Sequence, residues 1–184
     1  MGKSIGAVEL SSIGIGYKVQ DSILKEATVE MLVSRTICSG KYFMIFSGGV
    51  SDVESAVVCA DRVGGDAVID RLAVANAFDG IFPALGQSVV LNEGEIDSLG
   101  LVETFSGVSV LVAADYAGKA AKVTLFRLHI AMALGGKGLL LMTGNVSDVT
   151  TAVNAAAEAV RRRGLLVSEL VIPRPNKQLF QDYI

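Results

Sequence analysis

The sequence contains no tryptophan, and aromatic residues make up only 6% of its 184 positions. Alanine is abundant instead, and there are 20 glycines. Small side chains let elements or subunits pack closely, whereas a large ligand pocket is usually lined by bulky apolar and aromatic groups. We therefore expect closely packed elements or subunits and no large aromatic pocket.

Long apolar runs are also absent. No stretch of 18 apolar residues occurs, and the nearest candidate, residues 130–142, is interrupted by Gly135, Gly136 and Lys137. The first residues lack the apolar core of a secretion signal and the pattern for myristoylation. With 51% apolar and 19% charged residues, the chain has the composition of a folded protein. These features predict a soluble, cytoplasmic protein with no membrane partner.

Metal-binding motifs are missing from any single copy of the chain. The two cysteines and one histidine form no C-x-x-C or H-x-x-x-H spacing, so one chain alone cannot build an ordinary zinc or iron–sulfur site. In a cytoplasmic protein the cysteines are expected to be thiols rather than a disulfide. The net charge of −3 argues against nucleic acid as a partner.

The chain contains two related halves. The segments that match at an offset of 94 are 5–9 with 99–103, Asp21 with Asp115, and Lys25 with Lys119. Those that match at an offset of 96 are 40–41 with 136–137, 50–53 with 146–149, and 56–57 with 152–153. The matches keep their order along the chain with one insertion of two residues, which indicates a tandem duplication.

Each half shows the same succession of expected elements. Strands are expected at 6–10, 30–37, 42–46 and 68–74, and again at 100–104, 124–131, 139–143 and 165–172. Helices are expected at 17–27 and 110–121, with a second helix in each half that starts at Ser51 or Ser147 as the N-cap, Glu54 completing a capping box in the first. The order βαββαβ predicts an α+β fold in which helices cover one face of an antiparallel sheet. We expect a linker at 87–97.

The two halves differ in charge. Residues 1–98 hold 7 Lys+Arg and 13 Asp+Glu, a net charge of −6, whereas residues 99–184 hold 9 and 6, a net charge of +3. Halves of opposite sign that alternate around a ring would attract one another at every junction. Drift between duplicated halves would give the same numbers, so both interpretations stay open.

These motifs together resemble a known domain. Residues 6–9, the helix that ends in 21–25, and the order loop, strand, Ser-Asp-Val, helix are similar to the bacterial microcompartment shell domain. Two copies in one chain resemble the tandem-domain shell proteins, from residue 5 to about residue 175. Segments 33–38, 135–137 and 171–175 are similar to the branch that is associated with propanediol utilisation.

The resemblance implies a fold, an assembly and a location. It implies two tandem ferredoxin-like domains, 1–92 and 97–184, and a homotrimer that imitates a hexagonal tile. Such a tile would lie in the shell of a bacterial microcompartment and would not be an enzyme. The expected partners are other shell proteins and encapsulated redox enzymes or flavoproteins.

The resemblance also implies a central pore lined by two glycine-containing turns. Its lining residues would be Cys38, Ser39, Gly40 and Lys41 from the first half and Leu134, Gly135, Gly136 and Lys137 from the second. In this branch one pore-loop cysteine from each of three chains holds an iron–sulfur cluster, which implies one [4Fe–4S] cluster per trimer with three Cys38 ligands. A cube of this kind normally takes four thiolates, so one iron would stay open to water or another ligand.

Two other functions remain open. The same tile could have an unmetallated pore that conducts metabolites, with Cys38 and Lys41 tuning selectivity. The chain could also form a small regulatory trimer that binds a metabolite between subunits. Lys41 and Lys137 would either create a positive potential near the pore or be solvated loop residues.

Each of the remaining candidate residues could have a structural role instead of a functional one. The resemblance places Lys25, Lys119 and Arg174 at the edge of the tile, although the two lysines would also be ordinary exposed helix residues. Cys59 is expected to pack inside a helix face, and His129 to be a structural or interface residue rather than the partner of Cys38. The run 161–163, three arginines, is expected to end a helix, where cations suit the helix dipole.

Overall fold

The computed structural model describes residues 3–92, 94, 96–130 and 134–180. By its internal packing the chain divides into two compact units, Met1–Ala77 and Phe78–Ile184. Each unit has its own four-stranded antiparallel sheet. Among the described residues, no helix combines the length and the apolar character needed to cross a membrane.

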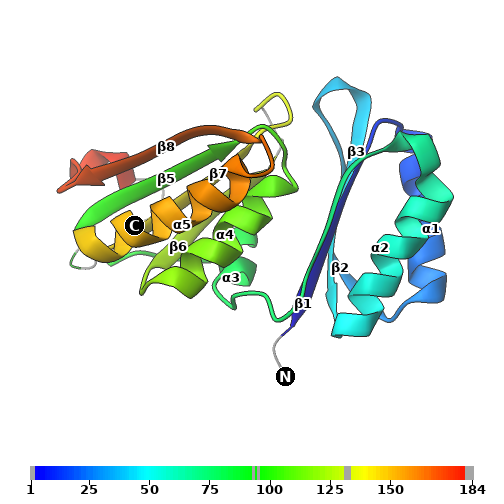
Figure 1. The fold of residues 1–184 in the computed structure, drawn as a ribbon, viewed down its shortest axis with the longest axis horizontal. Helices are drawn as coiled ribbons and strands as arrows, with labels where there is room; N and C mark the ends of the chain where they lie inside the picture. Colours follow the sequence, from blue (N-terminus) through cyan, green and yellow to red (C-terminus); the bar gives the residue numbers. More distant parts are fainter. Residues whose placement is uncertain (1–2, 93, 95, 131–133, 181–184) are drawn as a thin grey trace. The chain divides into compact units, whose positions relative to one another are not determined.

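The first unit has the order βαββαβ, interrupted by two short 3₁₀ turns (Figure 1). Its elements are β1 (Ser4–Leu10), α1 (Ile13–Glu26), β2 (Val29–Ile37), η1 (Cys38–Gly40), β3 (Lys41–Gly48), α2 (Val50–Gly64), η2 (Gly65–Ala67) and β4 (Val68–Val74). The strands lie in the order β2-β3-β1-β4. Both helices cover the same face of this sheet (Figure 1).

The second unit repeats this arrangement with additions at both ends. Its elements are α3 (Ile81–Leu85), β5 (Ser98–Thr104), α4 (Ser109–Ala120), β6 (Thr124–Ile130), β7 (Gly138–Gly144), α5 (Val146–Arg161), β8 (Leu166–Pro173) and η4 (Lys177–Phe180). The strands lie in the order β6-β7-β5-β8, which is the order of the first sheet. The predicted α+β class and the βαββαβ order are therefore confirmed in both halves.

The core of the first unit lies between its sheet and its two helices. Alternate residues of β1 and β3 point toward the helices, because side chains along a strand alternate between the two faces of a sheet. The buried residues of this core are Val8, Leu10, Val19, Ile23, Tyr42, Met44, Phe46, Val53, Ala56, Cys59 and Ala60. The predicted packing role of Cys59 is confirmed.

The second unit buries an apolar cluster that the duplication does not predict. Leu99, Phe126 and Leu141 come from its sheet, whereas Leu91 comes from the segment before β5 and Phe180 from η4. The rings of Phe126 and Phe180 lie 5.7 Å apart between centroids. The segments on either side of the duplicated domain thus add to the core of this unit.

The predicted helix caps are wrong. The second helix of each half begins at Val50 and Val146, so Gly49 and Asn145 are the N-caps, while Ser51 and Ser147 lie in the first turn. Asn145 Oδ1 accepts a hydrogen bond from the backbone N–H of Asp148 at 2.8 Å. The capping box with Glu54 fails for the same reason, because residue N3 of α2 is Asp52 rather than Glu54.

The other element limits differ by a few residues. The first helix begins at Ile13, four residues before its predicted start, because Ser12 caps it and accepts a bond from Ile15 N–H. The helix α3 was not predicted, since five residues are too few to show a helical period. Ala131, which ends a predicted strand, lies outside the described residues.

The charge difference between the halves arises largely in the connecting segment. Residues 78–98 contain four acidic residues and no Lys or Arg, so they account for −4 of the −6 charge of residues 1–98. The compact unit 1–77 has a net charge of only −2, from 7 Lys+Arg and 9 Asp+Glu. The duplicated domain itself is therefore only weakly acidic in the first half. The predicted domain limits, 1–92 and 97–184, stay a prediction.

Candidate functional site: the two glycine turns

The first turn contains Cys38 and connects the edge strand β2 to β3. Residues Cys38–Gly40 form a single 3₁₀ turn, which the chain enters from an extended Ile37. Gly40 has a φ of +73°, and a Cβ atom built there would meet no other atom within 4 Å. The need for glycine at this position is therefore conformational rather than steric.

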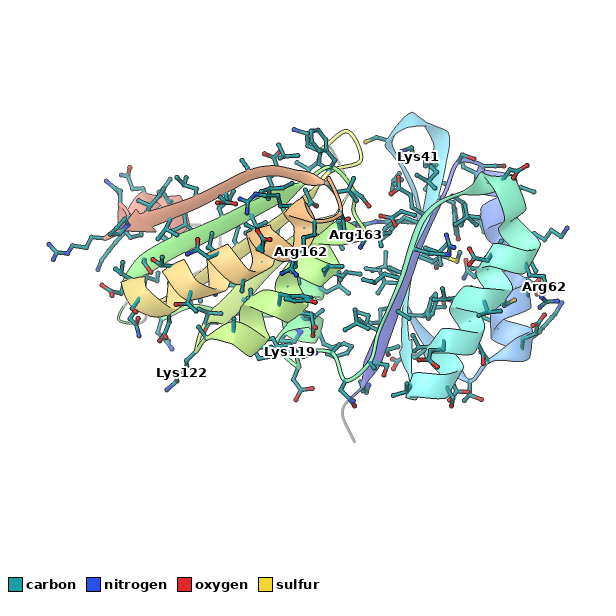
Figure 2. The ribbon with its side chains drawn as sticks, in the orientation of Figure 1. Lys41, Arg62, Lys119, Lys122, Arg162 and Arg163 are labelled. Atoms are coloured by element: carbon teal, nitrogen blue, oxygen red, sulfur yellow. The ribbon has the colours of Figure 1, made fainter. Side chains whose placement is uncertain are left out.

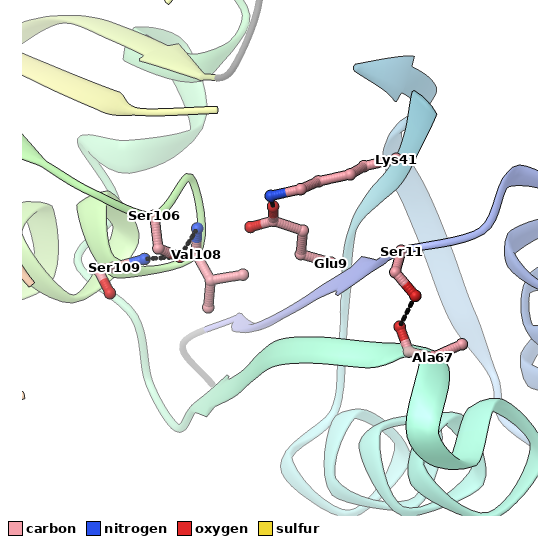
Figure 3. Close-up of polar contacts among 7 residues, drawn as sticks. All are labelled: Glu9, Ser11, Lys41, Ala67, Ser106, Val108 and Ser109. Atoms are coloured by element: carbon pink, nitrogen blue, oxygen red, sulfur yellow. Dashed lines mark hydrogen bonds and ion pairs between the residues drawn. The ribbon is translucent and has the colours of Figure 1, made fainter. Parts of the chain in front are cut away.

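Lys41 closes the first turn (Figure 2), and its side chain forms an ion pair with a residue of the sheet. Its Nζ lies 2.9 Å from Oε1 of Glu9, a residue of the central strand β1 (Figure 3). The Glu9 side chain is only 3% exposed and that of Lys41 31% exposed. A carboxylate that is this well buried requires a charged or hydrogen-bonding partner, and the lysine provides it.

The second turn has a different backbone. Gly135 and Gly136 both have left-handed backbone angles, with φ values of +62° and +89°. The N–H of Lys137 donates to the carbonyl oxygen of Leu134 at 3.2 Å, which closes the turn. Leu134 is half-buried. The turn therefore begins with an apolar side chain that offers no thiol.

Lys137 forms the same ion pair as Lys41. Its Nζ lies 2.9 Å from Oε1 of Glu103, and the Ser168 hydroxyl donates to the other carboxylate oxygen at 3.1 Å. The hydrogen bond from Lys137 lowers the pKa of Glu103; burial opposes this shift, and the Ser168 bond and the lysine charge reinforce it. Both loop lysines are thus paired and partly buried, which favours neither a free positive potential nor a simple solvated lysine.

The two cysteines lie in contrasting environments, and neither forms a disulfide. Cys38 is half-buried in the turn, whereas Cys59 is buried between α1 and α2. Burial raises the pKa of the Cys59 thiol, and the neighbouring Glu26 carboxylate raises it further. Cys59 is therefore a poor thiolate donor.

A metal site is not complete within one chain. In the part of the chain that the structure describes, no three His, Cys, Asp or Glu side chains gather closely enough to hold a metal ion. Cys38 alone supplies one sulfur ligand, which suits an iron–sulfur cluster only if further copies contribute theirs.

The predicted tile-edge lysines both pair with an aspartate one turn earlier in their helix. Lys25 lies 2.6 Å from Asp21, and both side chains are exposed. Lys119 (Figure 2) lies 2.8 Å from Asp115, which is buried and also accepts the backbone N–H of Phe78 at 2.9 Å. The aspartate of the duplicated pair is therefore buried in one half only, while both lysines are exposed.

The other candidates take the following positions. Arg174 has a φ of +47°, and its N–H donates to the Asp97 carbonyl oxygen at 2.9 Å. Helix α5 ends at Arg161, with Arg162 as the C-cap, so the arginine run ends the helix as predicted (Figure 2). His129 is half-buried on β6 opposite Leu139.

Comparison with known proteins assigns the chain to a family. The sequence profile described as "BMC domain" matches residues 4–77 and 98–175. The chain is 39% identical to the bacterial microcompartment shell protein PduT of Citrobacter freundii, over 100% of this chain and 99% of that protein. The chain belongs to the BMC-domain family. Its members named here are structural proteins of a bacterial microcompartment shell, and this location holds for the BMC-domain chain as well.

Two further relatives support the tandem organisation of the BMC-domain chain. The shell protein EutM of Salmonella typhimurium is 37% identical over 84 residues, which cover 46% of this chain and 85% of EutM. A crystal structure of a microcompartment protein from Desulfitobacterium hafniense superimposes with a TM-score of 0.90 and 36% identity, covering 97% and 98% of the two chains. One half of the chain thus corresponds to most of EutM, and the whole chain to the second protein.

The sequence analysis of this BMC-domain chain identified the two loops, but it missed the two carboxylates that pair with the loop lysines. Glu9 and Glu103 are matched by the duplication, and this was the available signal. The pairing itself depends on strand register, which places each glutamate near the start of the neighbouring strand. The lining of a shared pore and the tile-edge roles stay predictions.

Proposed function

We propose that three copies of this shell protein form a tile whose central pore holds one [4Fe–4S] cluster between three Cys38 thiolates. The cluster would supply one-electron transfer, so the tile would pass electrons, or an iron–sulfur unit, between the lumen of the microcompartment and the cytoplasm. The protein would have no substrate turnover of its own. Other shell proteins and encapsulated redox enzymes or flavoproteins would be its partners.

The exposed face of α1 supports assembly with further copies. Ile13, Tyr17 and Leu24 follow one another on this helix at helical spacing and are 36%, 62% and 50% exposed. The duplicated helix α4 is buried through its first seven residues, Ser109 to Asp115, and Leu111, which matches Tyr17, is fully buried. An apolar stripe that is exposed in one copy of a duplicated helix and buried in the other fits a subunit interface. We propose that this exposed stripe of α1 packs against another molecule of the same protein.

The position of Cys38 carries the cluster proposal. It is the half-buried cysteine, it lies in a tight turn, and the turn of the other half has Leu134 near the matching place. A trimer would therefore present three thiolates at one centre rather than six. Three thiolates can hold a cluster with one open iron site, whereas one thiolate cannot.

A second candidate function is an open pore that conducts metabolites. The ion pairs of Lys41 with Glu9 and of Lys137 with Glu103 favour it, because paired charges next to the turns suit a polar channel and require no metal. In that case Cys38 would only tune selectivity.

Anaerobic purification followed by iron and sulfide analysis separates the two functions. The cluster proposal predicts about four iron and four sulfide ions per trimer with a brown colour. Cys38→Ala should abolish both the colour and the iron, whereas the matched control Cys59→Ala should keep them. Protein that is free of iron under these conditions, or iron that survives Cys38→Ala, would favour the open pore.

A further inference from the structure

One arrangement occurs in both halves and has no role in the cluster proposal. A glutamate near the end of the first strand of each unit forms a 2.9 Å ion pair with the lysine that closes the turn. The two-residue insertion between the halves changes the turn, from one left-handed glycine to two, yet the pair is the same. The pair is therefore independent of the details of the loop.

We propose that Glu9 and Glu103 are positioning residues that cancel the charge of the loop lysines and hold them against the sheet. The turns would then offer no free ammonium group to a solute, so anions would gain no attraction from Lys41 or Lys137. This inference rests on the proposed location of the turns at a pore. It concerns the selectivity of that pore, whether or not a cluster fills it.

The geometry of the first unit supports a turn without net charge beside it. Glu9 lies opposite Phe43 on one side and opposite Asp70 on the other. Residues opposite each other in antiparallel strands project from the same face of the sheet, and Arg35 of β2 lies opposite Phe43 in the same row. This end of the face therefore carries two carboxylates, Glu9 and Asp70, for the two cations Lys41 and Arg35. Asp70 Oδ1 accepts the backbone N–H of Arg71 at 2.8 Å.

The second unit has one carboxylate where the first has two. Ser168 of β8 takes the register position opposite Glu103 that Asp70 takes opposite Glu9. Its hydroxyl donates to Glu103, so the carboxylate has two partners and the local net charge of glutamate and lysine is zero. Both turns should therefore lie beside a face of the sheet whose carboxylates and cations balance.

A reagent-charge experiment on Cys38 tests the proposal in iron-free protein. In a Cys59→Ala background, the Cys38 thiolate attacks an aromatic disulfide, forms a mixed disulfide and releases the aromatic thiolate, whose absorbance gives the rate. The rate with dianionic dithionitrobenzoate is divided by the rate with neutral dithiodipyridine, and this ratio is compared between variants. Glu9→Gln should raise the ratio for the anionic reagent roughly threefold at low salt, because it leaves the Lys41 charge uncompensated. Salt at about 1 M should remove the effect.

Two further variants separate charge from a merely structural effect. Glu30→Gln makes the same substitution in an exposed pair with Lys3, whose atoms are 3.6 Å apart, and should leave the ratio unchanged. Adding Lys41→Met to Glu9→Gln should return the ratio to its original value. A Glu9→Gln ratio equal to that of Glu30→Gln, or one that Lys41→Met does not reverse, would overturn the proposal.

Lysine footprinting provides a second readout that does not depend on the thiol. Glu9→Gln should raise the acylation rate of Lys41 severalfold, and Glu103→Gln should do the same for Lys137, while the exposed Lys25 reacts equally in all variants. Unchanged rates at Lys41 and Lys137 would show that the glutamates do not hold them. Because all measurements use iron-free protein, a failed cluster proposal leaves this result intact.

Discussion

Gly40 shows how a single backbone angle supports the Cys38 turn. Its φ of +73° is costly for any residue with a Cβ atom, although space for that atom is available. Gly40→Ala should therefore destabilise the protein by about 1 kcal/mol in urea unfolding. The midpoint of unfolding should fall without a change in its slope.

Gly14 is the matched control, because it too has open space around a built Cβ but lies in α1 without a positive φ. Gly14→Ala should stabilise the protein by about 0.5–1 kcal/mol through helix propensity. Equal effects of both alanines would contradict the conformational explanation for Gly40.

Glu103 gives the ion pairs a measurable pH dependence. Its pKa is lowered in the folded protein, first of all by the hydrogen bond from Lys137. A lowered pKa stabilises the folded state at pH values above the unfolded pKa, and this stabilisation is lost as the pH falls through the folded pKa. Glu103→Gln should therefore cost about 1 kcal/mol at pH 7, and the difference from the original protein should shrink toward about pH 3.

Unfolding in urea at these two pH values measures the change. The exposed Glu54 on α2 supplies the control Glu54→Gln, which should alter stability by less than about 0.5 kcal/mol at either pH. A Glu103→Gln cost that is the same at both pH values would mean that packing, and not the charged pair, provides the stability.

The N-caps of α2 and α5 show that two duplicated helices can begin with different capping residues. Asn145 caps α5 through its side chain, whereas Gly49 caps α2 without one. Asn145→Ala should destabilise the protein by about 1 kcal/mol, whereas Asn145→Gly, which copies the first half, should cost only a few tenths of that. Thermal unfolding of the two variants tests this order, and an equal loss in both would show that the Asn145 bonds do not stabilise the helix.

The elements were predictable where their pattern is periodic. Strands such as β4 at Val68–Val74 were placed without error, because alternating apolar residues and the duplication agree. The caps were misplaced by two residues, because Ser51 and Ser147 are good capping residues that happen to lie inside the first turn. The Glu9–Lys41 pair could not be read from spacing, since 32 residues separate its partners and only strand register brings them together.

At the level of the entire chain, duplication has produced two units with the same topology and different surfaces. The Asp–Lys pair on the first helix of each half is exposed at Asp21 and Lys25, but Asp115 is buried. The duplication matched these residues in the two sequences but did not predict this difference, because burial depends on what covers each helix. A chain with unlike halves is suited to assemble in a single orientation, since its two related helices expose different side chains, Tyr17 and Leu24 on α1 but Tyr116 on α4.

Tyr17 allows the assembly to be tested directly. It is 62% exposed on α1 and contacts only the ring of Tyr42 among the aromatic residues that the structure describes, at 5.0 Å between centroids. If a second copy covers α1, Tyr17→Glu places a charge in a buried apolar contact and should convert trimers into single chains of 19.2 kDa in light scattering. Val58→Glu introduces the same charge at a residue of α2 that is 66% exposed and should leave the trimer intact.

Because both side chains are exposed within one chain, neither variant should unfold the protein, so its circular dichroism should be unchanged. A Tyr17→Glu protein that still forms trimers would place α1 on the outside of the tile, and a different surface would then have to join the subunits.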